Sequence, residues 1–486
     1  MSMYLLSIDQ STSGTKALLF DKNGDLIRRE DLPHKQIINE KGWVEHDLNE
    51  IYANTLAVIK AVLEGVDKSL VVGIGISNQR ETAAVWDKST GEPITNAIVW
   101  QCARGADICT RLANHGPRIK EITGLNLSPY FTGAKIAWVI ENTPPNKNLC
   151  AGTIDSWLIY KLTGNFKCDY SNASRTQLLD LHTGAWSEEV CELFGVDPKI
   201  LPEICPSDSC FGYTNCDVFF DKAIPIYGVM GDSHAALFGQ GCHSPGMMKV
   251  TYGTGSSVVM NIGPKPIASD NVVTSIAWNI GGETSYILEG NINYTGAIIK
   301  WLVDDLGIIE SPNQAEEYAQ KANPEDETYL VPAFTGLGAP YWESTARAVI
   351  CGMSRTTGKA EIVKAALEAI GYQIADIIAA MKLSAQGLES HPLRVDGGPT
   401  RNNFLMQFQS DIINLSVLVP EIEELSGAGA AYMAGIALGV YDKQQLFSRI
   451  KRKSFKPKMN EETRHKKQKG WKAALDMVLT NKGGSI

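Results

Sequence analysis

The chain has 486 residues, with 44% hydrophobic and 20% charged residues, which allows two to four folded domains. Its formal net charge of -9 argues against nucleic acid or an anionic membrane as the main partner, because both favour a basic surface. No signal-peptide pattern precedes Asp9 and no window approaches a membrane span, so we expect a cytoplasmic protein. The closest cysteines are Cys205, Cys210 and Cys216, and their irregular spacing favours buried or unreactive thiols in a reducing cytosol over a zinc site.

The N-terminal residues predict a strand, a polar turn and a second strand. Apolar residues at 4–8 and 17–20 flank the turn of residues 9–14. Helical periodicity at 50–64 leads into the apolar run 71–76, which is typical of a fully buried strand. This alternation of strand, helix and strand predicts the α/β class.

The second half of the chain repeats this opening pattern. Strands are predicted at 248–252 and 256–262, joined by a glycine turn, and a long helical segment follows at 363–381. Each half therefore begins with a strand–turn–strand unit whose turn is rich in Gly, Ser and Thr. We predict two closely packed domains, residues 1–242 and 243–486, because no low-complexity linker separates them.

Three turns rich in small residues indicate a nucleotide site. The turn at 9–15 can wrap a phosphate with amides and hydroxyls while Asp9 holds a metal ion, although an ordinary Ser/Thr-rich hairpin turn also fits. The turn at 252–255 lets the backbone approach a ligand closely. The turn at 396–403 follows a strand and opens a helix, which suits a base or ribose. Because there is no Walker A sequence, Mg²⁺ and turn amides must neutralise most of the phosphate charge.

Asp232 lies where a strand over residues 224–231 gives way to a helix of small residues. Two roles fit this position: a helix N-cap, and a general base that takes the proton from an attacking hydroxyl. The local sequence alone favours the cap.

Arg80 and Glu81 follow the buried strand at 71–76, at the strand end where α/β folds place ligands. They could hydrogen-bond vicinal hydroxyls, or they could form an ordinary surface ion pair. Trp100 and Tyr130 could pack against the C–H side of a polyol, although such aromatic residues are more often part of a core.

Together these segments resemble the FGGY family of carbohydrate kinases over nearly the whole chain, and most of all its glycerol-phosphorylating members. The diagnostic stretches are residues 42–47, 78–82, 96–102, 251–255, 331–342 and 394–398. The resemblance implies two actin/hexokinase/Hsp70-like (ribonuclease H-like) domains with an ATP-binding cleft between them. It also implies transfer of the ATP γ-phosphoryl group to a hydroxyl of a small polyol or ketose. Since family members are often dimers or tetramers, it implies a homo-oligomer too.

The resemblance further implies a role for each matching residue. Asp9 corresponds to the metal-associated aspartate, and Asp232 corresponds to the catalytic base. The residues implied to contact ATP are Thr12, Ser13, Lys16, Gly253, Thr254, Gly296, Lys300, Gly398 and Asn402. The residues implied to contact the polyol are Arg80, Glu81, Trp100, Tyr130 and Asp232.

Three departures from the family pattern bear on the ligands. The glycerol-phosphorylating members carry glutamine after the catalytic aspartate and phenylalanine against the carbon chain, where this chain has Ser233 and Ser257. Both serines shorten a side chain of the substrate pocket, which opens room and adds hydroxyls. We therefore expect a substrate longer than glycerol, either a tetritol or, alternatively, a ketopentose such as xylulose. Lys300 replaces a frequent glutamine, which leaves base selectivity open.

A different class of protein, a non-catalytic nucleotide switch of the actin or Hsp70 kind, would share the phosphate turns. It would not need the polyol-contacting set, and that set favours an enzyme.

Overall fold

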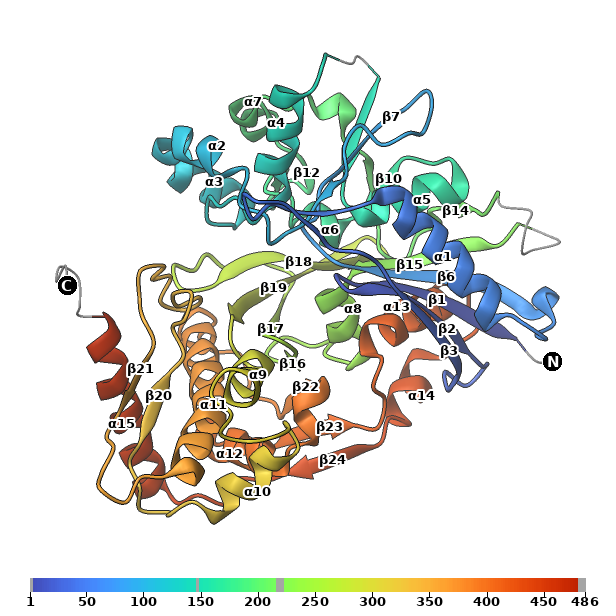
Figure 1. Ribbon diagram of the computed structural model, residues 1–486. Helices are drawn as coiled ribbons and strands as arrows, with labels where there is room; N and C mark the ends of the chain where they lie inside the picture. The colour runs from blue at the N-terminus through green and yellow to red at the C-terminus, as the bar shows by residue number, and fades with distance from the viewer. Residues whose placement is uncertain (1–2, 146–147, 216–222, 480–486) are drawn as a thin grey trace.

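The computed structural model describes residues 3–145, 148–215 and 223–479. Two large mixed sheets with helices packed around them form the molecule (Figure 1). The predicted α/β class is confirmed, and so are the predicted strands and helices, with boundaries that differ by a few residues.

The first sheet positions the carboxyl ends of three parallel strands at one edge. In spatial order its strands are β14 (Gly212–Tyr213), β15 (Pro225–Gly231), β6 (Val71–Asn78), β1 (Tyr4–Gln10), β2 (Gly14–Phe20) and β3 (Leu26–Pro33). Strands β15, β6 and β1 run parallel, whereas β1, β2 and β3 form an antiparallel meander. In open α/β sheets, ligands bind beyond the carboxyl ends of parallel strands.

The second sheet repeats the arrangement of a hairpin beside parallel strands. In spatial order its strands are β18 (Val273–Ile280), β19 (Glu283–Ile292), β17 (Ser256–Gly263), β16 (Met248–Tyr252), β22 (Leu393–Asp396), β23 (Val417–Pro420) and β24 (Arg452–Phe455). Strand β16 pairs antiparallel with β17 and parallel with β22. The turns that leave β1 and β16 therefore occupy equivalent places in the two sheets.

Helices α8 (Asp232–Gly239) and α13 (Leu425–Ala437) lie between the two sheets (Figure 1). Helix α13 follows the second sheet in sequence, yet it packs against β1, β6, β15 and α8. Only small residues allow this approach: a Cβ on Gly429 would lie 1.8 Å from the carbonyl oxygen of Ala235. The two halves of the chain are therefore closely packed against each other near the end of β15.

Other elements surround these sheets. The remaining helices are α1 (Leu48–Val62), α2 (Ala106–Arg111), α3 (Gly116–Thr123), α4 (Thr132–Asn142), α5 (Ile154–Thr163), α6 (Tyr170–Ala173), α7 (Glu188–Phe194), α9 (Gly296–Asp304), α10 (Gln314–Lys321), α11 (Lys359–Ser384), α12 (Asn403–Ile413), α14 (Lys443–Ser448) and α15 (Glu461–Leu479). The short strands are β4 (Ile37–Ile38), β5 (Val44–His46), β7 (Ala84–Asp87), β8 (Ala97–Ile98), β9 (Leu149–Gly152), β10 (Lys167–Asp169), β11 (Leu179–Asp180), β12 (Ala185–Trp186), β13 (Glu203–Cys205), β20 (Tyr329–Val331) and β21 (Val349–Cys351).

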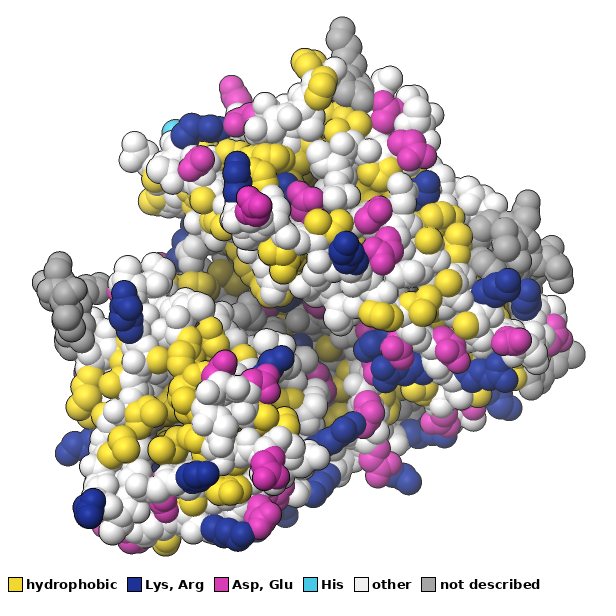
Figure 2. All heavy atoms as spheres, viewed as in Figure 1, with side chains coloured by type: hydrophobic (Ala, Val, Ile, Leu, Met, Phe, Trp, Pro, Cys, Tyr) yellow, Lys and Arg dark blue, Asp and Glu magenta, His cyan; other side chains and the backbone are white. Residues whose placement is uncertain are grey.

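Figure 2 shows the surface hollowed between the upper lobe, which carries α2 to α7, and the lower lobe, which carries α9 to α12.

Within the described ranges, no helix is both long and apolar enough to cross a membrane. The described cysteines are free thiols, and most are buried. Cys205 is buried and Cys210 is half-buried, whereas Cys216 lies outside the described residues.

Candidate active site

Asp232 presents a partly exposed carboxylate at the end of β15. Gly231 occupies the N-cap position of α8 and Asp232 is the first helical residue, so the N-cap interpretation is wrong. The Asp232 carboxylate accepts a 2.6 Å hydrogen bond from the backbone N–H of Ser233, and its Oδ1 lies 3.1 Å from Nε of Arg80. Since 37% of the side chain is exposed, a ligand can reach the carboxylate.

Arg80 and Glu81 are buried and do not form a surface ion pair with each other. Arg80 donates from both terminal nitrogens to the carboxylate of Glu289, each at 2.7 Å. Glu81 accepts from Nε of Arg175 at 2.5 Å, and Arg175 also lies 3.1 Å from Glu289. Four side chains from three parts of the sequence thus form one buried ion network behind Asp232.

The predicted aromatic residues lie beside this network and reach the first phosphate turn. The rings of Trp100 and Tyr130 meet edge to face with centroids 5.6 Å apart. Nε1 of Trp100 donates to Oγ1 of Thr12 at 2.9 Å, and Nζ of Lys135 donates to the backbone carbonyl of Tyr130. Trp100, which is predicted to contact the polyol, therefore also contacts the turn that is predicted to bind phosphate.

The two serines that depart from the family pattern are neighbours in space. Oγ of Ser233 donates to Oγ of Ser257 at 3.4 Å, and Ser257 donates to Oε1 of Glu289 at 3.2 Å. Because Ser233 directly follows Asp232, these hydroxyls lie next to the candidate base.

Asp9 lies at the carboxyl end of β1, close to Asp232. The strand register aligns Asp9 with Ser77 on β6 and aligns Ser77 with Met230 on β15. Asp9 is 4% exposed, and its Oδ1 has no hydrogen-bond partner in the described structure. Burial raises the pKa of Asp9 to about 6, although Lys16, with Nζ 3.7 Å from Oδ2, acts in the opposite direction. A buried carboxylate oxygen without a partner fits a hard cation such as Mg²⁺.

The first turn, residues 11–14, is closed by a hydrogen bond from the backbone N–H of Ser11 to the carbonyl of Gly14, 2.9 Å long. Thr12 is half-buried, Ser13 is exposed, and Nζ of Lys16 lies 2.6 Å from Glu424. The turn thus offers hydroxyls and one lysine close to Asp9.

A pocket of about 520 Å³ lies beside the second turn. Its lining residues are Gly253, Thr254, Tyr294, Gly296, Ala297, Lys300, Trp301, Asp305, Phe334 and Pro399. Backbone hydrogen bonds tie the turn to the start of α9, for example from Gly296 N–H to the Gly253 carbonyl at 2.9 Å. The third turn reaches this pocket through Pro399, which adjoins Gly398.

Two further residues predicted to contact ATP, Asn402 and Lys300, interact with other parts of the chain. Asn402 caps α12 by accepting a 2.9 Å hydrogen bond from the backbone N–H of Leu405. Lys300 is 78% exposed and lies 3.5 Å from Asp304, one turn further along the same helix. The cap leaves the amide nitrogen of Asn402 available for a nucleoside, and the exposure of Lys300 leaves it able to move.

Sequence reasoning missed Arg175 and Glu289. Arg175 is 1% exposed in the segment after α6, and Glu289 is fully buried inside β19. No local motif marks either residue. The one available indication is that a charged residue within an apolar strand must find a partner when the strand is buried.

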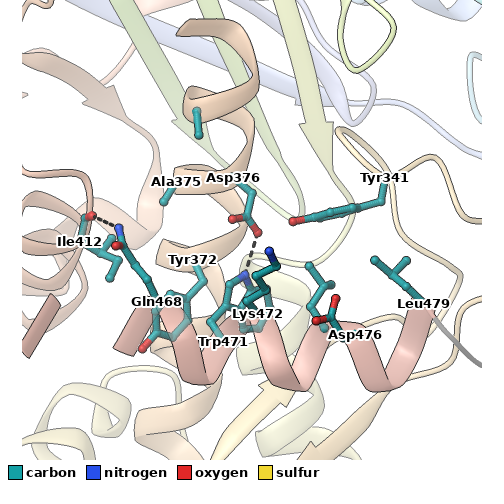
Figure 3. Close-up of a pocket in the computed structure, with 12 residues that line it drawn as sticks. Tyr341, Tyr372, Ala375, Asp376, Ile412, Gln468, Trp471, Lys472, Asp476 and Leu479 are labelled. Atoms are coloured by element: carbon teal, nitrogen blue, oxygen red, sulfur yellow. Dashed lines mark hydrogen bonds between the residues drawn. The ribbon is translucent and has the colours of Figure 1, made fainter. Parts of the chain in front are cut away.

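A second pocket, of about 320 Å³, lies between α11 and α15, with further lining residues from α12 and from Tyr341 (Figure 3). Asp376 points into it and accepts a 2.7 Å hydrogen bond from Nε1 of Trp471, whose ring stacks on that of Tyr372. None of the residues predicted to contact ATP or the polyol lines this pocket.

Comparisons with known proteins show which family the chain belongs to. The family model described as "FGGY family of carbohydrate kinases, N-terminal domain" matches residues 4–239, and the C-terminal domain model matches residues 248–438. "Glycerol kinase 1" of Thermotoga maritima is 48% identical over 98% of this chain and 100% of its own length. "Glycerol kinase" of Bacillus velezensis is 43% identical over 99% of this chain and 100% of its own length.

Two solved structures are similar to this fold. A crystal structure of Plasmodium falciparum glycerol kinase with ADP superposes with a TM-score of 0.93 at 35% identity, covering 98% of both chains. A ligand-bound xylulose kinase from Lactobacillus acidophilus superposes with a TM-score of 0.89, covering 99% of both chains. At 21% identity, the latter shows a shared fold alone.

The fold and the site define a two-domain, ATP-dependent phosphotransferase with an alcohol group as acceptor. The chain belongs to the FGGY family of carbohydrate kinases. The predicted family and the predicted actin/hexokinase-like fold class are therefore confirmed.

Proposed function

We propose that the chain phosphorylates one hydroxyl of a small linear polyol, with Asp232 as the general base. The Asp232 carboxylate accepts the proton of the acceptor hydroxyl as its oxygen attacks the γ-phosphorus of ATP. The bond between the γ-phosphorus and the bridging oxygen breaks, and ADP leaves. The observation that supports this most is the partly exposed Asp232 carboxylate, which lies 3.1 Å from Arg80 and near Asp9.

The polyol-contacting set would orient the substrate. Arg80 and Glu81 would hydrogen-bond vicinal hydroxyls, while Trp100 and Tyr130 would face the carbon chain. Closure of the lobes around the hollow would expel water and so limit wasteful hydrolysis of ATP.

The nucleotide would bind across the two halves. Thr12, Ser13 and Lys16 in one half and Gly253 and Thr254 in the other would contact the phosphates. Gly296, Lys300, Gly398 and Asn402 would contact the nucleoside. The pocket beside Gly253 supports this assignment.

We propose Mg²⁺ as the metal held by Asp9. The partnerless Oδ1 of Asp9 and the nearby hydroxyls of Thr12 and Ser13 are oxygen donors of the kind that Mg²⁺ prefers. When bound with ATP, the ion supplies charge neutralisation at the phosphates.

Ser233 and Ser257 support a substrate longer than glycerol, such as a tetritol. Their hydroxyls lie 3.4 Å apart beside Asp232 and can hydrogen-bond an additional substrate hydroxyl. A ketopentose has less support, because the glycerol kinases compared above are 35–48% identical to this chain whereas the xylulose kinase is 21% identical.

The test is ADP release measured with glycerol, erythritol, threitol, erythrulose, xylulose and ribulose, ranked by kcat/KM. We expect a four-carbon polyol to rank first. If no small alcohol or sugar stimulates ADP release, a nucleotide-switch protein is favoured and the kinase proposal fails.

We further propose a division into domains at residue 242, a homodimer or homotetramer, and a reducing cytoplasmic location. The free, mostly buried cysteines support the reducing compartment. Light scattering on the purified chain tests the oligomeric state, and a monomer at micromolar concentration would contradict it.

A further inference from the structure

We propose that Glu289, on β19 of the second half, is the positioning residue of the polyol site and holds Arg80 in its substrate-binding geometry. This inference rests on the proposed function. It gives the second half of the chain, which already contributes Ser257 to the proposed polyol pocket, a part in orienting a charged polyol contact of the first half.

The contacts of Glu289 support this role. Its carboxylate is completely buried and accepts a hydrogen bond from each terminal nitrogen of Arg80, both 2.7 Å long. It also lies 3.1 Å from Nη1 of Arg175 and accepts the Ser257 hydroxyl at 3.2 Å. A bidentate pair of this kind fixes the plane of the guanidinium as well as its distance.

Because Glu289 binds both terminal nitrogens of Arg80, only the Nε edge of the guanidinium faces Asp232. The two terminal nitrogens donate to Glu289, and Nε is the nitrogen that lies 3.1 Å from Asp232. Without the Glu289 charge, the terminal nitrogens of Arg80 could turn toward Asp232, because Asp232 is the other carboxylate paired with Arg80. A bidentate pair with Arg80 would then occupy the Asp232 oxygens that must accept the substrate proton.

The charges around Glu289 also require it to be ionised. Burial would raise its pKa, but the adjacent Arg175 and Arg80 guanidiniums hold the pKa of Glu289 well below its ordinary value. Arg175 in turn pairs with Glu81, which is itself a proposed polyol contact. Glu289 therefore connects both charged polyol contacts, since Arg80 binds it directly and Glu81 binds it through Arg175.

The pair also spans the two halves of the chain, since Arg80 and Glu289 are 209 residues apart in sequence. Arg80 follows β6 of the first sheet, and Glu289 belongs to β19 of the second. The polyol site is therefore complete only when the two sheets are packed in the positions that bring Arg80 and Glu289 together.

The experiment compares Glu289→Gln with wild type by steady-state kinetics on the full chain. Gln keeps the shape of the side chain but removes the charge. We expect polyol KM to rise about tenfold or more and kcat to fall by a similar factor, with ATP KM within about twofold of wild type. The matched control is Glu189→Gln, which neutralises an exposed bidentate pair with Arg118 and should leave all three constants unchanged.

A second variant separates positioning from mere folding. The variant Glu289→Asp keeps the buried negative charge but shortens the side chain by one methylene, so that its carboxylate can no longer hold Arg80 in the observed bidentate geometry. If Glu289 only supplies a charge that stabilises the fold, Glu289→Asp keeps both thermal stability and wild-type polyol KM, and the proposal is overturned. If Glu289 positions Arg80, Glu289→Asp is more stable than Glu289→Gln while its polyol KM stays raised.

Two further outcomes are decisive. Wild-type polyol KM and kcat in a folded Glu289→Gln variant would overturn the inference and leave the kinase function standing. Absence of polyol-dependent turnover in wild type would instead overturn the proposed function, and the inference with it. If neither variant folds, Ser257→Ala assayed with glycerol decides, because glycerol lacks the additional hydroxyl proposed to contact Ser257: loss of the hydrogen bond to the Glu289 carboxylate must raise glycerol KM at least about threefold without changing ATP KM, and an unchanged glycerol KM overturns the inference.

Discussion

Nε of Arg80 lies 3.1 Å from Oδ1 of Asp232, and it joins a buried ion network to the carboxylate that we propose as the base. A guanidinium in this position can orient the carboxylate toward a bound hydroxyl. The chemistry of the site is therefore expected to depend on Asp232 more than on any other side chain.

Replacing Asp232 with Asn is expected to lower kcat on the order of 10²–10⁴-fold, because the amide cannot accept the substrate proton. Binding of a non-hydrolysable ATP analogue, measured by calorimetry, should stay nearly intact. The exposed Asp107 provides the control Asp107→Asn, which should keep wild-type kcat. Full activity of the Asp232 variant would show that the base is a different residue.

Replacing Asp9 with Asn is expected to raise the Mg²⁺ concentration for half-maximal activity by about tenfold, because an amide oxygen binds a divalent cation more weakly than a carboxylate. The measurement is initial rate against Mg²⁺ at fixed ATP, and excess Mg²⁺ should recover part of the lost rate. An unchanged Mg²⁺ dependence would place the metal elsewhere.

Replacing Ser257 with Phe should shift selectivity toward glycerol. An aromatic wall adds about 1–2 kcal/mol of apolar contact to a three-carbon chain and occupies the room for a fourth carbon. We expect the ratio of kcat/KM for erythritol over glycerol to fall about tenfold, whereas Ser257→Ala should change that ratio far less. A ratio that rises in the Phe variant would contradict a longer substrate.

Replacing Gly296 with Ala should weaken ATP binding. The added Cβ would lie 2.8 Å from the Gly253 carbonyl oxygen and would displace the second phosphate turn. We expect ATP KM to rise about tenfold with polyol KM little changed. Gly116→Ala is the matched control, because a Cβ there meets nothing nearer than 3.9 Å. Equal effects of the two substitutions on ATP KM would argue against the turn as a phosphate site.

Asp376, in the second pocket, provides a prediction about stability. Burial raises its pKa to about 6, whereas hydrogen bonds from Trp471 and Tyr341 act in the opposite direction. Because the pKa of Asp376 is higher in the folded state than in the unfolded state, its protonated carboxyl group stabilises the fold. This stabilisation is fully present below about pH 4 and is lost as pH rises through about 6.

Relative to Asp376→Asn, the free energy of unfolding of wild type should therefore fall by up to about 3 kcal/mol between pH 4 and pH 7. Urea denaturation of both proteins at the two pH values measures this difference, and other titrating groups cancel in the comparison. The difference between wild type and variant would be the same at both pH values if Asp376 has an ordinary pKa.

The elements and the glycine turns could be predicted because their determinants are local. Apolar runs such as residues 71–76 and the small-residue turns after β1 and β16 specify strand and turn within a few residues. The packing of α13 on the first sheet could not be predicted, because a helix of small apolar residues can pack on many surfaces.

The role of Asp232 could not be decided from the sequence, because a cap and a base occur in the same local pattern. Only the structure shows Gly231 at the cap position, and only the parallel pairing of β1, β6 and β15 places Asp9 near Asp232.

By itself, the sequence determined the order of the strands, helices and small-residue turns, and through its motifs the resemblance to a kinase family. Tertiary structure alone decided which charges meet: Arg80 pairs with Glu289 across 209 residues of sequence, and Arg175 pairs with Glu81. The physical reason is that a buried charge is stable only beside its partner, and two partners from distant strands become neighbours only after the sheets have packed.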